Sequence, residues 1–193
     1  GAVNMFQIGF RTLRRSVPAV AITVLAGYLL IVTFTPYGSQ RISLAATVAL
    51  MLPVAVAEVM ICWVFVGTHL QAYLRRSGAA VSIGAGVLVT STLFALSFAA
   101  HSPAPDEPLA LLPFLLAGIA SALFFFAVRD VYASAIFVAL VLALVMQGRL
   151  DPLYTSQISP VVVGCAVLSV LTLAACQWYL SKRFITLEIP VKK

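Results

Sequence analysis

Glu58 is the residue whose type and surroundings most directly suggest chemistry. It stands inside an apolar stretch over residues 42–68, and a carboxyl group at such a depth is costly in a membrane and faces a cavity or a partner. It could handle protons, act as a catalytic base, or stay a neutral carboxylic acid hydrogen-bonded to another helix. We therefore name Glu58 as the candidate catalytic residue, with a structural carboxylic acid as the plainer alternative.

The two histidines give Glu58 no immediate partner. His69 follows on the same helix face, but roughly 16 Å along the helix axis, which is too far for a direct pair. His101 opens a polar loop, where a solvated side chain is expected. A joint role with Glu58 would require folding to bring one of these rings close to the carboxyl group.

Other catalytic and metal-binding patterns are absent from the sequence. There is no HExxH helix, no glycine-rich phosphate loop and no Ser/His/Asp arrangement. The three cysteines, Cys62, Cys165 and Cys176, lie in apolar stretches without a CxxC pair, as structural thiols do. We expect no metal site and no cofactor.

Six apolar stretches must position these residues. Each is near the length of about 20 residues that a helix needs to cross a bilayer core. They cover residues 17–35, 42–68, 79–100, 109–128, 131–146 and 160–180. Only 9% of the 193 residues are charged, against about 25% in soluble domains. The sequence predicts an all-α polytopic membrane protein, a single bundle of six transmembrane helices over residues 17–183.

The positive charges fall on one side of these stretches. With the N-terminus in the cytoplasm, only Arg41 and Arg149 of the 12 lysines and arginines lie outside, which is the bias that sets membrane topology. Both termini are therefore predicted to be cytoplasmic, and the membrane to be a bacterial inner membrane. Because topology accounts for the net charge of +6, we expect the lipid bilayer as a partner and no nucleic acid.

Segments outside the bundle could dock other membrane subunits. Residues 1–16 are predicted to form an amphipathic helix at the cytoplasmic interface, with Phe6 and Phe10 on its apolar stripe and arginines beside it. Asp106 and Glu107 make the outer loop acidic. Residues 184–193 form a cytoplasmic tail, in which Glu188 lies within an alternating run that could add a strand to a partner's sheet.

Two local patterns predict how the helices pack. Small residues recur four apart at Ser82 and Gly86, and again over residues 117–122, and such residues let helix backbones approach closely in lipid. The third and fourth spans are thus expected to pack inside the bundle. Pro53 predicts a kink or a strong tilt in the long second stretch.

Residues 50–148 resemble the CPBP family of CAAX-prenyl-protease-like and bacteriocin-processing membrane proteins. Residues 57–76, with Glu58 and Phe65-Val66-Gly67, resemble its first motif, a Glu-Glu pair followed by Phe-Arg-Gly. Residues 92–98 resemble the second motif, Phe-Ala-Leu-x-His, and residues 118–138 the final pair of helices. The resemblance implies that family's helical bundle.

The resemblance also implies that the peptidase chemistry is lost. In active members the glutamates activate water and histidines support the transition state. Alignment on Phe65-Val66-Gly67 puts Ile61 and Cys62 at the glutamates, and alignment on Glu58 keeps one glutamate but puts Cys62 at the arginine. Phe98 and Val138 stand at the histidines, and Leu142 follows four residues after Val138. Alkyl and phenyl groups cannot perform acid–base catalysis.

Three functions follow as hypotheses. The first is a non-catalytic integral membrane subunit, accessory or scaffold protein, of a larger membrane complex. The second is a small transporter or a membrane component of a transport system, although transport sites gather several polar groups near the midplane. The third is a divergent intramembrane peptidase that uses Glu58 with His69 or His101. On balance the sequence indicates a protein that is not an enzyme.

Overall fold

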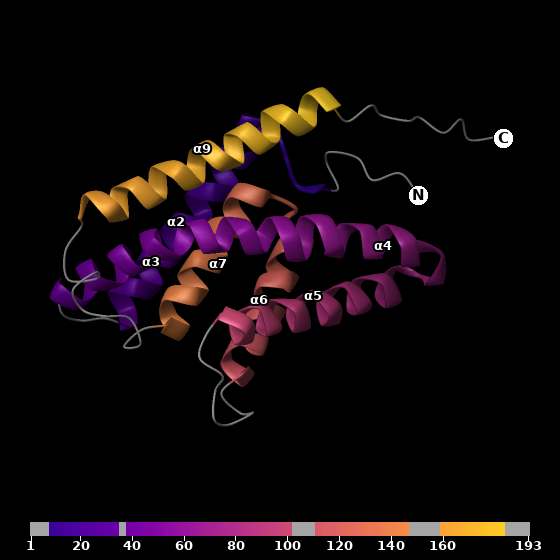
Figure 1. The fold of residues 1–193 in the computed structure, drawn as a ribbon, viewed down its shortest axis with the longest axis horizontal. Coiled ribbons are helices and arrows are strands. Elements are labelled where there is room, and N and C mark those ends of the chain that lie inside the picture. The colour runs from indigo at the N-terminus through magenta and orange to yellow at the C-terminus, as the bar shows by residue number, and fades with distance from the viewer. Residues whose placement is uncertain (1–7, 35–37, 102–110, 147–158, 184–193) are drawn as a thin grey trace.

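The computed structural model describes residues 8–34, 38–101, 111–146 and 159–183. Every element in these ranges is a helix (Figure 1). In chain order they are α2 (Leu13–Phe34), α3 (Gly38–Glu58), η1 (Val59–Gly67), α4 (Thr68–Leu74), η2 (Arg75–Ser77), α5 (Ala79–His101), α6 (Leu112–Val128), α7 (Val131–Met146) and α9 (Pro160–Arg183). The described part of each of the six apolar stretches forms helix, as predicted.

Among the described residues, three helical segments are long and apolar enough to cross a membrane. They are Ile42–Ser77, Ala79–Ala100 and Pro160–Ser181, while α6 and α7 are apolar but shorter. In Figure 1 α9, the continuous helix from α3 to α4, and α5 run in similar directions, and α6 and α7 cross them. The exterior of α2 and α9 is rich in exposed branched side chains, as a surface facing lipid tails would be.

The second stretch departs from regular helix geometry. The helix α3 continues through Pro53 to Glu58, and the hydrogen bonding then changes to the π-type over the nine residues of η1. Such segments are rare, are usually single turns, and occur frequently at functional sites. Gly67 ends η1 at a close approach, since a Cβ there would lie 2.9 Å from Phe126 Cζ. The change of helix type thus begins beside the candidate carboxylate.

The close packing of α5 and α6 confirms the prediction from their small residues. A Cβ on Gly118 would lie 3.0 Å from both the Cα and the carbonyl oxygen of Ser91. Backbone atoms cannot move aside as a flexible side chain can, so this crossing requires glycine at residue 118. These two helices therefore meet where Phe94 enters the core.

In its described part, residues 8–16, the N-terminal segment differs from the continuous helix predicted over residues 1–16. Phe10, Arg11 and Thr12 are not helical, and α2 begins at Leu13. Gly9 has φ +96° and accepts a hydrogen bond of 3.0 Å from the backbone N–H of Val131. The chain turns here because it packs against the connection between α6 and α7, where Ile8 and Phe10 are buried.

Candidate functional site

Glu58 is held at the junction of α3 and η1 by two side chains. The hydroxyl of Ser97 on α5 donates to one carboxylate oxygen at 2.6 Å, and the thiol of Cys62 donates to the other at 3.1 Å. The Ser97 hydroxyl also lies 2.8 Å from the carbonyl oxygen of Phe94. Both oxygens of the half-buried carboxyl group thus have partners within the helix bundle.

Aromatic rings line the same part of the core. Trp63, Phe94, Phe98 and Phe114 form a series that we call the aromatic ladder. Successive ring centroids lie 5.5, 5.1 and 4.9 Å apart, and the last pair is stacked. Trp63 and Phe94 are fully buried. Offset and tilted arrangements of this kind are favourable, so the ladder fills the space beside Ser97 with hydrocarbon.

The positions assigned to catalytic groups by resemblance lie in this apolar core. Phe98 is a member of the ladder, and Cys62, Val138 and Leu142 are buried in the same hydrophobic cluster. Ile61 points the other way, with 55% of its surface exposed. None of these side chains apart from the weakly polar thiol can donate or accept a proton.

His69 is placed apart from the Glu58 contacts. It is exposed on α4, and its Nδ1 lies 2.6 Å from the carbonyl oxygen of Phe65, one turn earlier. His101 ends α5. Across the described ranges no three His, Cys, Asp or Glu side chains come together as metal ligands would. The structure joins Glu58 to Ser97 and Cys62, and not to His69.

A second polar group lies where α6 turns into α7. Arg129 has φ 53° and ends α6, and Asp130 begins α7 by accepting the backbone N–H of Ala133 at 2.9 Å. The hydroxyl of Ser16 donates to the other oxygen of Asp130 at 2.5 Å. Asp130 is fully buried. Its carboxylate therefore caps one helix and fastens the start of α2 to it.

The side chain of Arg129 reaches α4. Its guanidinium donates to the Gln71 side chain and lies 5.0 Å from the ring centre of Phe126, a cation–π distance. Burial lowers the pKa of Arg129 from its ordinary value, and the charge of Arg11 lowers it further. Arginine stays protonated in proteins despite such shifts, so a half-buried positive charge is held at this end of the bundle.

A related contact attaches α9. The hydroxyl of Tyr132 donates to the Gln177 side chain, whose amide donates to the backbone oxygen of Arg11 at 3.2 Å.

An Asp just before an apolar run is a helix-start signal, so the role of Asp130 was accessible from the sequence. The partners Gln71 and Gln177 were not, because they come from distant segments.

Of the five candidate docking residues, the structure describes Phe10. Phe10 is buried, and its ring packs edge-to-face on Tyr132 with centroids 6.4 Å apart. Phe10 therefore packs against α7 within the chain. Phe6, Asp106, Glu107 and Glu188 lie outside the described residues.

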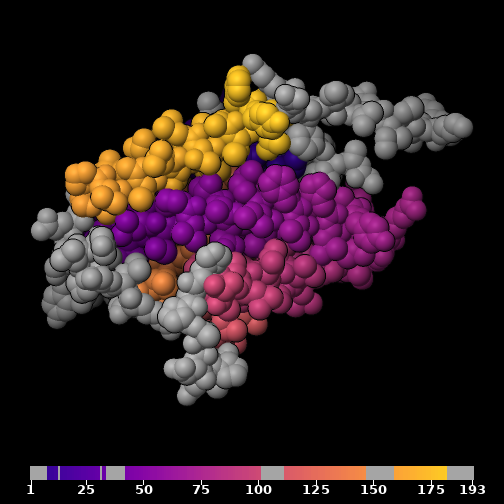
Figure 2. Space-filling view, in the orientation of Figure 1, coloured from indigo at the N-terminus to yellow at the C-terminus, as the bar shows by residue number. Residues whose placement is uncertain are grey.

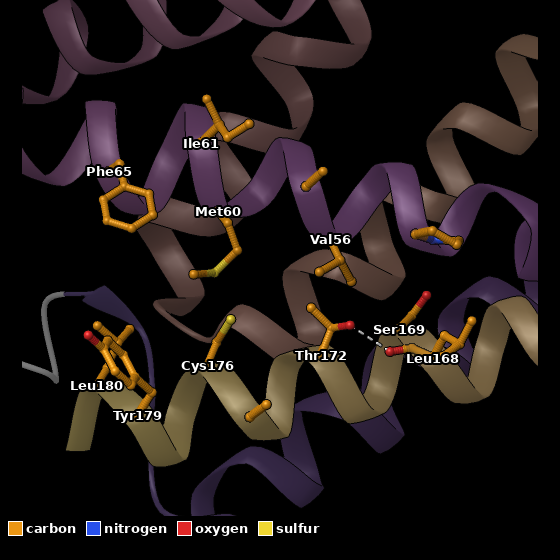
Figure 3. A pocket seen from close by; sticks show the side chains of 13 residues that line it. Val56, Met60, Ile61, Phe65, Leu168, Ser169, Thr172, Cys176, Tyr179 and Leu180 are labelled. Atoms are coloured by element: carbon orange, nitrogen blue, oxygen red, sulfur yellow. Dashed lines mark hydrogen bonds between the residues drawn. The ribbon is translucent and has the colours of Figure 1, made fainter. Parts of the chain in front are cut away.

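An apolar groove of about 620 Å³ separates the C-terminal half of α9 from η1 and the end of α3 (Figure 3). One wall carries Val56, Met60 and Phe65, and the other carries Thr172, Cys176 and Tyr179. Neither wall includes Glu58, so the groove is separate from the Glu58 contacts. Figure 2 shows α9 lying along α3 over one side of the molecule.

Comparison with known proteins gives no match: no family model, curated protein or solved structure shows significant similarity to the chain. Function is therefore inferred from its residues and their geometry.

Proposed function

We propose that this protein is a non-catalytic integral membrane subunit, an accessory or scaffold protein of a larger membrane complex. Its bundle of six transmembrane helices, similar to that of the CPBP family, would have both termini in the cytoplasm of a bacterial cell. The observation that carries the proposal is the structural role of Glu58. Its carboxyl group is hydrogen-bonded to Ser97 and Cys62 beside the aromatic ladder.

A peptidase would need more than this carboxyl group. General acid–base catalysis requires a group within hydrogen-bond reach of substrate and water. The ring of Phe98 and the alkyl side chains of Val138 and Leu142 occupy the places that the resemblance gives to histidines and their neighbour. Acid–base chemistry by Glu58 would therefore lack the histidines that support the transition state in active members of that family.

A transporter is also less well supported. Sites in secondary transporters gather several polar groups at broken helices near the midplane. Here α3 changes to the π-type at Glu58, but the side chains of η1 that follow are apolar, with Trp63 and Val64 fully packed. The change of helix type thus adjusts packing around a satisfied carboxyl group.

The variant Glu58→Gln tests whether the carboxyl group does chemistry. Glutamine keeps the size and the acceptor oxygen for Ser97 but cannot ionise. In cells from which the gene for this protein is deleted, we expect Glu58→Gln to correct any defect of the deletion as fully as the wild-type chain does. The control Ser97→Ala should also correct it, because it removes a structural hydrogen bond alone. Full loss by Glu58→Gln at normal protein level would overturn the proposal in favour of transport or peptide cleavage.

A further inference from the structure

The groove beside α9 arises because that helix is attached unevenly. The helix packs mainly against α3, and the bonds of Gln177 fasten its C-terminal half on another side. The same half stands off from η1, which leaves the groove lined by Met60, Ile61 and Phe65 opposite Cys176 and Tyr179 (Figure 3). The contacts that fix α9 therefore hold the groove open.

The length of the groove matches one leaflet of a bilayer. Its lining runs from Leu168 to Leu180 on α9 and from Pro53 to Phe65 on the opposite wall. Twelve residues of helix rise about 18 Å, and half of a hydrocarbon core of about 30 Å is about 15 Å. A partner helix crossing the membrane would need a seat along both leaflets, whereas a single lipid chain needs one.

The lining of the groove is suited to a hydrocarbon chain. The hydroxyl of Ser169 donates to the carbonyl oxygen of Cys165 at 2.7 Å. The hydroxyl of Thr172 donates to that of Leu168 at 2.8 Å (Figure 3). The third hydroxyl of the lining belongs to Tyr179, which is 55% exposed. The rest of the wall is alkyl, thioether, thiol and aromatic. A flexible apolar chain can bury its surface here without leaving a polar group unpaired.

Basic residues follow in the chain after Tyr179 and Leu180, which line one end of the groove. Lys182 and Arg183 follow in the last turn of α9. The bond from Gln177 to the backbone of Arg11 places the start of α2, with exposed Arg14 and Arg15, at the same end of the bundle. With the proposed topology this end faces the cytoplasmic leaflet, which is rich in anionic lipids that basic residues attract.

We infer that the groove holds one acyl chain of an anionic phospholipid from the cytoplasmic leaflet, with its headgroup at the end of the bundle where α9 ends and α2 begins. This inference rests on the membrane embedding within the proposed function and not on the subunit role. The lipid fills the gap between α9 and η1, and so completes the packing of a helix that the chain alone covers on few sides.

Two neighbouring alanines give a matched test. Ala174 and Ala175 are both exposed on α9, but only Ala175 lines the groove. Each is changed to Trp, and native mass spectrometry counts the lipids kept by protein taken from vesicles of equal phosphatidylglycerol and phosphatidylcholine. We expect wild type and Ala174→Trp to keep one phosphatidylglycerol. Ala175→Trp should weaken its retention at least about tenfold, since excluding two methylene groups already costs roughly that factor.

Further variants keep the test decisive. If Ala175→Trp does not fold, Ile61→Trp obstructs the groove from the other wall and should give the same loss. Replacing Lys182 and Arg183 by Ala should abolish the preference for phosphatidylglycerol over phosphatidylcholine. Equal lipid retention by Ala174→Trp and Ala175→Trp would overturn the inference. So would a second copy or a partner helix bound in the groove in place of lipid. If the wild-type protein shows no preference for phosphatidylglycerol but keeps its partner subunits, the inference fails and the subunit proposal stands.

Discussion

Asp130 is the side chain on which the joint between α2, α6 and α7 depends most. It is fully buried and accepts from Ser16 and from the backbone of Ala133. We expect Asp130→Ala to lower the free energy of unfolding by about 2–4 kcal/mol, since it removes a helix cap and a buried charge-assisted hydrogen bond. Ser16→Ala should cost about 1 kcal/mol, because the cap remains.

Unfolding in mixed micelles, followed by circular dichroism, measures both changes. The double variant should be nearly as stable as Asp130→Ala alone, within a few tenths of a kcal/mol. The effects of substituting two residues in direct contact do not add. Additive losses, or equal losses from the two single variants, would show that the Asp130–Ser16 contact is not the joint described here.

Single residues also show where sequence reasoning succeeds. Glu58 is identifiable as the one carboxylate deep in an apolar stretch, and Cys62 follows it at the four-residue spacing of helix neighbours. Ser97 lies 39 residues away in the chain, and no local pattern links it to Glu58. The carboxyl group was therefore predictable, but its partner was not, because the partner depends on how α5 packs against η1.

At the scale of elements, substituting two glycines by alanine distinguishes the effect of close helix packing on stability from the effect of helix propensity. We expect Gly118→Ala to destabilise the protein by about 1–3 kcal/mol, the cost of overpacking a tight site, because its Cβ would meet the backbone of Ser91. Gly84→Ala on α5 meets no atom within 4 Å and should be neutral or stabilising by up to about 1 kcal/mol. Thermal unfolding in one detergent compares them directly, and equal effects would count against the crossing of α5 and α6.

The helices themselves were largely predictable, but the helix type of η1 was not. The lengths of apolar stretches indicate helix, and recurring small residues indicate the tight α5–α6 contact. A change to π-type hydrogen bonding leaves no periodic signal in residues 59–67, which are apolar on every side. The turn at Gly9 was missed for another reason: the stripe containing Phe10 has helical spacing, and the contact of Phe10 with Tyr132 comes from a distant segment.

At the scale of the whole molecule, the proposed topology has a direct consequence for chemical labelling. In a variant without Cys62, Cys165 and Cys176, single cysteines at residues 106 and 155 should react with a membrane-impermeant maleimide on intact cells. Cysteines at residues 14 and 76 should react only after permeabilisation, because positive residues are retained on the cytoplasmic side. Labelling of residue 76 from outside would show that the topology is the reverse of the one proposed, with the groove in the outer leaflet.

The mass of the gently solubilised, affinity-purified protein tests the central claim most directly. For a non-catalytic subunit we expect other membrane-protein chains to co-purify in fixed stoichiometry, and to do so equally with wild type and Glu58→Gln, since the carboxyl group has a structural role. Identification of those chains by mass spectrometry would name the complex. A lone monomer or homodimer, with a cellular activity that Glu58→Gln abolishes, would contradict the account.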